Sequence, residues 1–423
     1  MIVVNYSNLA DRIPEWRTIK DAVDIVMQCN PDYLFRAFQG GGRPIPESPA
    51  TAYDQFISCG YTESEAKKLA WFMSRYGLTY SHLKMSINEV KSRKNIEFSV
   101  VEHTQYVYKH VWDPITLEPI KDTKPMALDF SKWDLINPET KRKFDLKSTQ
   151  IFCAKRMGIV QRELVVNGGM RWITDITNES FRKWIKSRLK RYKRLSVDTI
   201  HYDILFGHAR VAYEVVKWMR DNGYYKGDPF NHPAVVDLYN AACKIVDIAK
   251  SLGFRVETWI GIYVRTPYKM PKLDGVYMSP TSKEILKIKF DESRWRNFVK
   301  ITKDKLGNVR LYSFIDNGGL DTYPMHALSQ KLSPKLQCLF FTEWDKYMRD
   351  KGIIPVYPLH DGVMGATIIR KSFGKYPIYD ATAPEFNTYD CIKKLIKKDY
   401  RFLILVGAAI AAGLIAFGLR RLS

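Results

Sequence analysis

The sequence predicts an α+β body followed by a C-terminal transmembrane helix. Segments with helical periodicity are mixed with β-branched and aromatic segments, and no internal repeat or low-complexity linker separates them. The chain has 423 residues, of which 46% are hydrophobic and 13% aromatic, enough for one large domain or two ordinary ones with proper cores. An uncharged run of 18 residues near the C-terminus predicts the transmembrane helix.

The charge balance predicts a polyanionic partner. The chain holds 66 Lys and Arg against 45 Asp and Glu, a net charge of +21, and such a surplus needs nucleic acid or a negatively charged membrane to offset its self-repulsion. Nucleic acid is the first candidate. The six cysteines lie far apart without a CxxC pair, which argues against a zinc site and a small disulfide scaffold and predicts a reduced, cytosolic body.

The first expected domain, residues 1–120, is a mixed helical and strand region. Three glycines at 40–42 lack the Gly-Lys-Ser/Thr that completes a phosphate loop, so they predict a flexible turn. Thr62–Tyr76 is a predicted helix, because Thr62 and Glu65 form a capping box and Gly77 ends the apolar stripe. Glu97–Trp112 is aromatic and β-branched and predicts a strand, in which His103 and His110 are ordinary surface or packing residues.

The second expected domain, residues 121–395, contains a strongly basic helix at Phe181–Arg194. One face is apolar, and the other carries only cations. Unrelieved like charges destabilise a bare helix, which favours phosphate contact, with membrane headgroups as the rival partner. The cations are Arg182, Lys183, Lys186, Arg188, Lys190, Arg191, Lys193 and Arg194.

Further elements of this domain follow from periodicity and from breaker residues. Helices are expected at Gly207–Asn222, Pro233–Leu252 and His326–Asp350, and a strand is expected at Phe254–Arg265. Ile353–Ile369 then combines two apolar, β-prone runs around a His-Asp-Gly corner, which predicts a hairpin with Asp361 at its tip.

The third expected domain is the membrane anchor, Phe402–Leu419. Its 18 residues would reach roughly 27 Å as a helix, enough to cross a hydrocarbon core, and basic residues flank both ends. Because only four residues follow, a tail anchor is expected, with the main domain cytoplasmic or inside a virion. Small residues spaced four apart, such as Gly407 and Ala411, would permit close helix pairing and hence a homo-oligomer.

Two carboxylates in the second domain suggest a metal site. Asp129 follows a short apolar strand and Asp361 is at the hairpin tip, and Asp134, five positions after Asp129, is expected beside them as a contact to the metal site or the sugar. Nucleotidyl transfer uses two divalent metals, and Mg²⁺ prefers carboxylates, while Arg182 and Lys186 could hold the incoming triphosphate. Taken singly, each Asp is equally consistent with an ordinary turn.

These residues resemble the motifs of palm-type nucleic-acid polymerases. Asp129 to Leu135 is similar to the first palm motif of family A DNA polymerases and to the Asp-x4-Asp motif of viral RNA polymerases. His360-Asp361 resembles the His-Asp of family A and single-subunit RNA polymerases, and Arg182-x3-Lys186 resembles the Arg-x3-Lys of their fingers helix. The resemblance implies a palm-like fold of helices and antiparallel strands, with Asp129 and Asp361 as catalytic metal ligands. The chain departs from the pattern because Lys193, not Gly, follows Tyr192, and no Gly-Asp-Asp is present.

The sequence therefore leaves three functions open. The first is a tail-anchored, basic replication protein of a virus or mobile element that extends nucleic acid by a two-metal mechanism. The second is a non-catalytic, membrane-anchored protein that binds nucleic acid as a minor virion or genome-linking component. The third is a protein whose positive charge serves anionic lipid. The first requires the carboxylates of Asp129 and Asp361 to lie within about 8 Å of each other.

Overall fold

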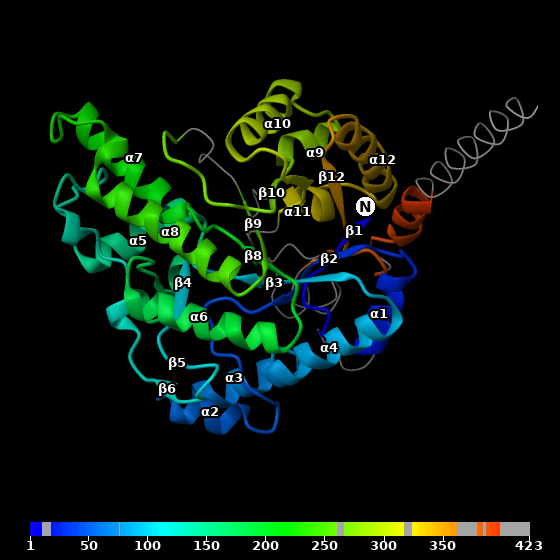
Figure 1. Ribbon diagram of the computed structural model, residues 1–423, viewed down its shortest axis with the longest axis horizontal. Helices are drawn as coiled ribbons and strands as arrows, with labels where there is room; N and C mark the ends of the chain where they lie inside the picture. The colour runs from blue at the N-terminus through cyan, green and yellow to red at the C-terminus, as the bar shows by residue number, and fades with distance from the viewer. Residues whose placement is uncertain are drawn as a thin grey trace, which may run out of the picture.

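The protein is built on a closed barrel of parallel strands. The computed structural model describes residues 1–10, 18–75, 77–259, 266–316, 324–361, 379–383 and 386–397. Strands follow one another around the barrel in chain order, and the last pairs in parallel with the first, which leaves no free edge among them (Figure 1). The barrel strands are β1 (Val3–Tyr6), β2 (Tyr33–Gln39), β3 (Glu97–Glu102), β8 (Thr199–Tyr202), β9 (Arg255–Trp259), β10 (Gly275–Met278), β11 (Arg310–Ser313) and β12 (Ile354–Asp361).

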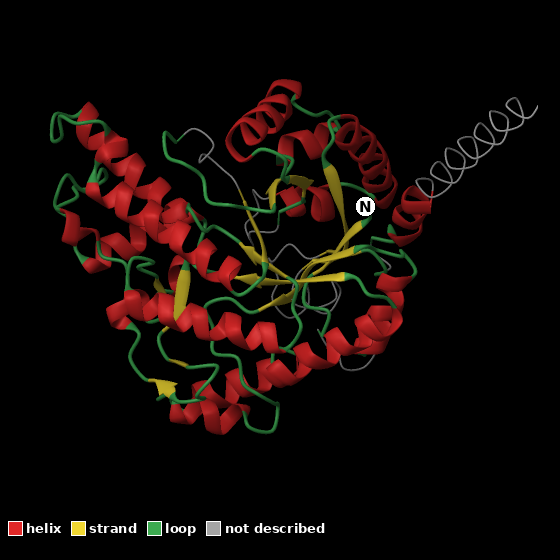
Figure 2. Cartoon of the chain, in the orientation of Figure 1, coloured by secondary structure: helices red, strands yellow, loops and turns green. Residues whose placement is uncertain are grey.

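Helices surround the barrel and cover its outer face (Figure 2). Strands covered on both faces are expected to be apolar throughout, and β1 and β8 are buried along their whole length. The helices that connect or flank the strands are α1 (Ile19–Met27), α2 (Ala52–Ser58), α3 (Glu63–Arg75), α4 (Tyr80–Arg93), α7 (Gly207–Asp221), α8 (Pro233–Ser251), α9 (Ser282–Lys287), α10 (Glu292–Leu306), α11 (Pro324–His326) and α12 (Pro334–Asp350), with the short helices η5 (Pro229–Asn231) and η7 (Ala327–Lys331).

A long insertion separates β3 from β8. It forms two small antiparallel pairs, β4 with β7 and β5 with β6, and it ends in α6, which leads into β8. Its elements are β4 (Tyr106–Tyr108), β5 (Val111–Trp112), β6 (Pro119–Ile120), η1 (Lys124–Met126), η2 (Phe130–Trp133), α5 (Leu146–Met157), η3 (Gln161–Glu163), η4 (Val165–Asn167), β7 (Arg171–Ile173) and α6 (Glu179–Arg194).

Side chains fill the inside of the barrel, so it is a packed core and not a pore. Large aromatic rings from β2, β10 and β11 meet there, with ring centroids about 5 to 6 Å apart. The fully buried members of this cluster are Val3, Tyr33, Phe35, Tyr277, Tyr312, Phe314 and Val356.

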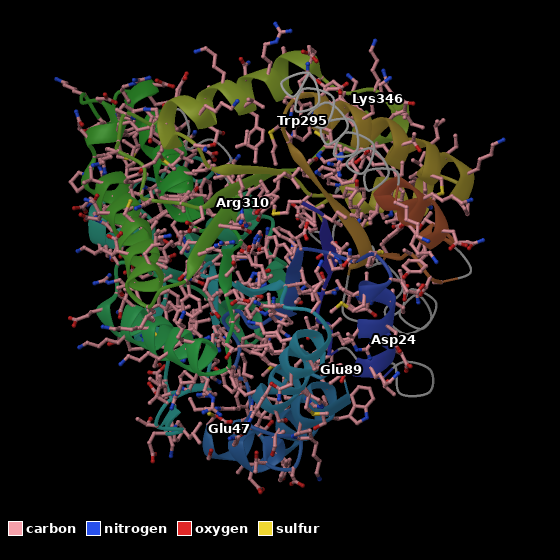
Figure 3. All side chains as sticks on the ribbon, turned by 45° about the vertical axis from the view of Figure 1, so that its right-hand side comes forward. Asp24, Glu47, Glu89, Trp295, Arg310 and Lys346 are labelled. Carbon is pink, nitrogen blue, oxygen red and sulfur yellow. A yellow bond between two sulfur atoms is a disulfide. The ribbon has the colours of Figure 1, made fainter. Side chains whose placement is uncertain are left out.

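Ion pairs occupy the amino-terminal end of the barrel. Glu97, the first residue of β3, pairs with Arg255 of β9 and, at 2.8 Å, with Arg310 of β11. Figure 3 shows Arg310 among the strands at the centre of the molecule and Lys346 on an outer helix. Polar groups at this end therefore bond to one another.

The predicted palm-like α+β fold is wrong. Every neighbouring pair of strands in the barrel is parallel, whereas a palm requires antiparallel strands. Residues 362–369, the second arm of the expected hairpin, lie outside the described residues. β12 itself lies between β11 and β1, and its end pairs in antiparallel fashion with β13 (Tyr379–Asp380). The strands of the barrel come from both sides of residue 120, the expected domain boundary.

Predictions for individual helices and strands were more accurate. The helices expected at 62–76, 181–194, 207–222 and 233–252 are confirmed as α3, α6, α7 and α8, and β9 lies in the strand expected at 254–265. Glu97–Trp112 is not one strand, because β3 ends at Glu102 and two short strands of the insertion follow.

The prediction of a membrane-anchored protein is corrected as well. No helix in the described ranges is long and apolar enough to cross a bilayer, and Phe402–Leu419, on which that prediction rested, lies outside those ranges. One disulfide departs from the expected reduced body. Cys338 of α12 is bonded to Cys391, with Cα atoms 5.9 Å apart, and this bond joins helical residues 389–397 to the barrel's outer layer.

Trp344 tests the packing between α12 and the barrel. Its side chain is fully buried, stacks on Phe340 and donates a hydrogen bond to Ser313 Oγ at 2.8 Å. We expect Trp344→Ala to lower the free energy of unfolding by about 3–5 kcal/mol in chemical denaturation. Leu339→Ala on the same helix, where the side chain is 47% exposed, should change it by no more than about 0.5 kcal/mol. Equal effects of the two substitutions would contradict this packing.

Candidate functional site

Polar and charged side chains gather where the barrel strands end. In barrels of this kind the carboxyl ends of all strands meet at one face, which carries the functional groups. We call five residues there the carboxyl-end cluster: Arg36 of β2, His103 after β3, Asp203 after β8, Tyr277 of β10 and Asp361 of β12. They come from segments far apart in the sequence, and only closure of the barrel brings them together.

Asp203 is the most heavily bonded member of the cluster. Its Oδ1 accepts a hydrogen bond from the Tyr277 hydroxyl at 3.2 Å, and its Oδ2 lies 3.3 Å from His103 Nδ1 and accepts from Gln105 Nε2 at 3.2 Å. Burial would raise the pKa of Asp203, but the hydrogen bond from His103 and the charge of Arg36 outweigh it and hold this pKa well below its usual range. The side chain is still 19% exposed, so an ionised carboxylate here remains accessible to a ligand.

Arg36 has an unusual backbone conformation. Its φ of 55° lies in the left-handed region, within an irregularity of the β2–β3 register between Leu34 and Phe38. Its backbone N–H donates to Ser99 Oγ at 2.8 Å, which holds this conformation. Irregular strand ends of this kind re-aim a side chain, and strained residues of this kind concentrate at functional sites.

The guanidinium of Arg36 has N–H donors without an acceptor among the described residues. The residue is 5% exposed and its Cζ lies 4.9 Å from the centre of the Phe314 ring, yet Nε and Nη1 find no acceptor within the described part of the chain. Burial alone would lower the pKa of Arg36. The negative charges of Asp203 and Asp361 raise it by more than burial lowers it, so the guanidinium stays cationic. A buried cation with open N–H groups is suited to bind ligand oxygen atoms.

Asp361 lies at the end of β12, next to β1. It is 1% exposed, and its Oδ1 accepts from Ser7 Oγ at 2.7 Å. The preceding His360 stacks on Tyr6 with ring centroids 4.9 Å apart. The negative charge of Asp316, which follows β11, also raises the pKa of Arg36.

A buried histidine and glutamate lie beneath the cluster. His201 stacks on Tyr277, with ring centroids 4.6 Å apart. Both of its ring nitrogens lack a hydrogen-bond partner among the described residues. Its Nδ1 lies 4.0 Å from Glu257 Oε2, which accepts from the Tyr33 hydroxyl at 2.7 Å. Burial holds the pKa of His201 well below its usual value and raises that of Glu257 to about 7. At pH 7 His201 is therefore neutral, and Glu257 is about half ionised.

The residues predicted to bind metal are not gathered in one site. Only Asp361 belongs to the carboxyl-end cluster. Asp129 caps η2 in the insertion, where it accepts from the Ser131 N–H at 2.9 Å, and exposed Asp134 pairs with Lys143 at 2.7 Å. In the part of the chain that the structure describes, no three His, Cys, Asp or Glu residues are grouped to hold a metal ion. The Mg²⁺ expected with these residues stays a prediction.

The basic helix α6 turns much of its charge toward the protein itself. Arg182 Nη1 donates to the Ile176 carbonyl at 3.0 Å, and Lys193 Nζ donates to the Gly253 carbonyl at 3.2 Å. Lys183 pairs with Glu179 at 2.8 Å, and Arg191 pairs with Glu47. Arg188 is buried, while Lys186, Lys190 and Arg194 are exposed.

No family model matches the sequence, and neither does any curated protein. Solved structures with a similar course of the chain include carbohydrate-active enzymes. A cyclomaltodextrin glucanotransferase has a TM-score of 0.46 and 13% identity, over 94% of this chain and 80% of the other. A debranching enzyme from Nostoc punctiforme has a TM-score of 0.45 and 10% identity, over 93% of this chain and 79% of the other. A trehalose-6-phosphate hydrolase from Bacillus licheniformis has a TM-score of 0.44 and 11% identity, over 93% of this chain and 72% of the other.

The predicted polymerase function is therefore wrong, and so are its nucleic-acid and membrane partners. The chain forms a closed parallel barrel, not a palm, and Asp129 belongs to the insertion whereas Asp361 belongs to a barrel strand. The alternative of a nucleic-acid-binding virion component has no support either. The motif resemblance rested on short segments that the fold places in different settings, Asp361 in the barrel and Asp129 and α6 in the insertion.

Glu257 makes the stability of the barrel dependent on pH. Its folded-state pKa of about 7 lies above its ordinary value of 4.5, so the folded protein favours the neutral form and loses stability as the pH rises from about 4.5 to about 7. We expect the stability of Glu257→Gln, relative to the wild type, to increase by about 3 kcal/mol between pH 4 and pH 8, measured by denaturation. Glu118→Gln, at an exposed loop position, is the control. A pH-independent difference would contradict the neutral buried state of Glu257.

Proposed function

We propose that the protein is a glycoside hydrolase whose reaction takes place at the carboxyl-end cluster. The observation that carries the proposal is an accessible Asp203, whose carboxylate contacts Tyr277, His103 and Gln105 and is kept ionised by His103 and by Arg36, a guanidinium with unsatisfied donors. Cleavage of a glycosidic bond usually requires two carboxyl groups, one ionised and one that donates a proton to the leaving oxygen. Water supplies the hydroxyl and the proton that complete the two products.

Asp203 is assigned the ionised role. It would stabilise or attack the sugar carbon that develops positive charge, as an ionised carboxylate does in such reactions. The proton donor is assigned to one of the neighbouring carboxyl groups around Arg36, either Asp361 or Asp316. Arg36 Nε and Nη1 would donate to substrate hydroxyls, and the indole of Trp259, partly exposed at the end of β9, offers an apolar face to a sugar ring.

The charge around Arg36 favours a neutral substrate over an anionic one. A phosphate or carboxylate on the substrate would be attracted by one guanidinium but repelled by ionised Asp203 and by whichever of Asp316 and Asp361 does not hold the proton. A sugar carries no charge and presents many hydroxyls, which pair with both the carboxylates and the guanidinium. The cluster is therefore suited to unmodified carbohydrate.

Asp203→Asn tests the role of the ionised carboxylate. The purified protein is assayed against aryl α- and β-glycosides and against polysaccharides, with released reducing ends as the readout. We expect the substitution to lower kcat by at least about a hundredfold, because the amide cannot carry the charge. Asp134→Asn, at an exposed position, is the control and should retain full activity. The proposal fails if the wild type cleaves no substrate in the panel, or if Asp203→Asn equals the control.

Arg36→Lys tests the second part of the site. The substitution keeps the positive charge beside the carboxyl groups but removes the planar pair of N–H donors. We expect KM to rise about tenfold or more, as for the loss of one charged hydrogen bond, with a smaller change in kcat. An unchanged KM would show that the guanidinium does not bind the substrate.

A further inference from the structure

A fully buried ion pair lies immediately behind the carboxyl-end cluster. Glu102, the last residue of β3, is 0% exposed, and Arg188 of α6 is 2% exposed. Arg188 Nε lies 3.1 Å from Glu102 Oε1, and Nη2 lies 3.1 Å from Oε2, so two parallel hydrogen bonds join the two side chains. This two-pronged geometry fixes their relative orientation as well as their distance.

Two further groups complete this ion pair. The Tyr192 hydroxyl donates to Glu102 Oε2 at 2.9 Å and accepts from Arg188 Nη2 at 2.8 Å. Arg188 Nη1 donates to the carbonyl of Arg43 at 2.9 Å, in the segment that follows β2. A buried pair with this many partners is costly to break and holds one arrangement. It connects α6, the end of β3 and the segment after β2.

The glycines after β2 fit closely against this arrangement. A Cβ at Gly40 would lie 1.9 Å from the Tyr192 hydroxyl, and a Cβ at Gly41 would lie 2.0 Å from Cδ2 of His103. The segment predicted to be a flexible turn is thus a close backbone approach, for which glycine is required. It presses on His103 from one side, while Tyr106 stacks on its ring, with centroids 5.3 Å apart.

We propose that Glu102, Arg188 and Tyr192 form a buried clamp that positions His103 against Asp203. His103 directly follows Glu102, so any movement of the clamped end of β3 moves the imidazole that contacts the Asp203 carboxylate. The clamp residues are positioning residues, because none of them has a contact with Asp203 among the described interactions. The proposal rests on the proposed function, in which Asp203 is the reactive carboxylate.

The clamp is tested first without any substrate. Of the eight histidines, His103 is identified by the NMR signal that His103→Gln removes, and its titration is followed in ¹³C-labelled protein. Burial, together with Arg36 and Arg43, lowers the pKa of His103, while Asp203 acts in the opposite direction. We expect Tyr192→Phe, Glu102→Gln and Arg188→Lys each to raise this pKa toward that of an exposed histidine, because the released ring becomes less buried.

Tyr357→Phe is the matched control. The Tyr357 hydroxyl also lies between an arginine and a carboxylate, donating to Asp345 and accepting from Arg349 at 3.0 Å, but these partners belong to α12, outside the barrel. Its removal should leave the His103 titration unchanged. The clamp is overturned if Tyr192→Phe leaves the titration unchanged, or if Tyr357→Phe shifts it equally. Should Glu102→Gln fail to fold, the tyrosine pair decides.

Activity provides the second readout. With any glycoside that the wild type cleaves, Tyr192→Phe should lower kcat about tenfold with little change in KM, because the clamp sets geometry and does not touch the substrate. An effect on KM alone would contradict a positioning role. If no glycoside is cleaved but the His103 titration responds as expected, the clamp stands and the proposed function fails.

Discussion

The parallel pairing of β1 with β12 is the contact on which the rest of the structure depends. It joins the first and last strands of the barrel, with Val3 opposite Val356 and Val4 opposite Tyr357. Closure removes the exposed strand edges and turns a twisted sheet into a core filled by aromatic rings. It also brings Ser7 to Asp361, two residues separated by most of the chain, within hydrogen-bond distance.

Charge is arranged unevenly along the barrel. At the amino-terminal end, Glu97 is matched by two arginines, and these groups satisfy one another. At the carboxyl-terminal end, one guanidinium faces several carboxylates and keeps unsatisfied donors. Unpaired buried donors are costly, and natural proteins retain them mainly where a ligand completes them. This contrast separates the end that stabilises the fold from the end that we assign to function.

Local features could be predicted from the sequence, whereas their assembly could not. The capping box at Thr62 and the apolar stripe at 181–194 indicated helices that the structure confirms. The error lay in pairing: the Asp-Gly at 361–362 suggested an antiparallel hairpin, although strands that alternate with helices are typical of a parallel sheet. That alternation was present at α8 and β9, and it would have placed the residues after each strand on one face.

The functional residues were missed for a related reason. His103 and Asp203 each follow a short strand and carry no motif, and the conformation of Arg36 depends on Ser99, 63 positions away. The basic face of α6 suggested an external partner because sequence alone does not show that Arg188 meets Glu102 across 86 positions. A charged segment can be assigned to the protein surface only when the tertiary partners of its side chains are known.

Closure of the barrel is tested most directly by whether the first and last strands are neighbours. Val3 and Val356 are buried and opposite each other, so Val3→Cys combined with Val356→Cys should form a disulfide under mild oxidation, identified as a linked peptide by mass spectrometry. We expect this bond in the double variant and not in Val3→Cys combined with Val276→Cys, on a strand that does not pair with β1. A folded double variant with no link between positions 3 and 356 would contradict the closed barrel, and with it the carboxyl-end cluster.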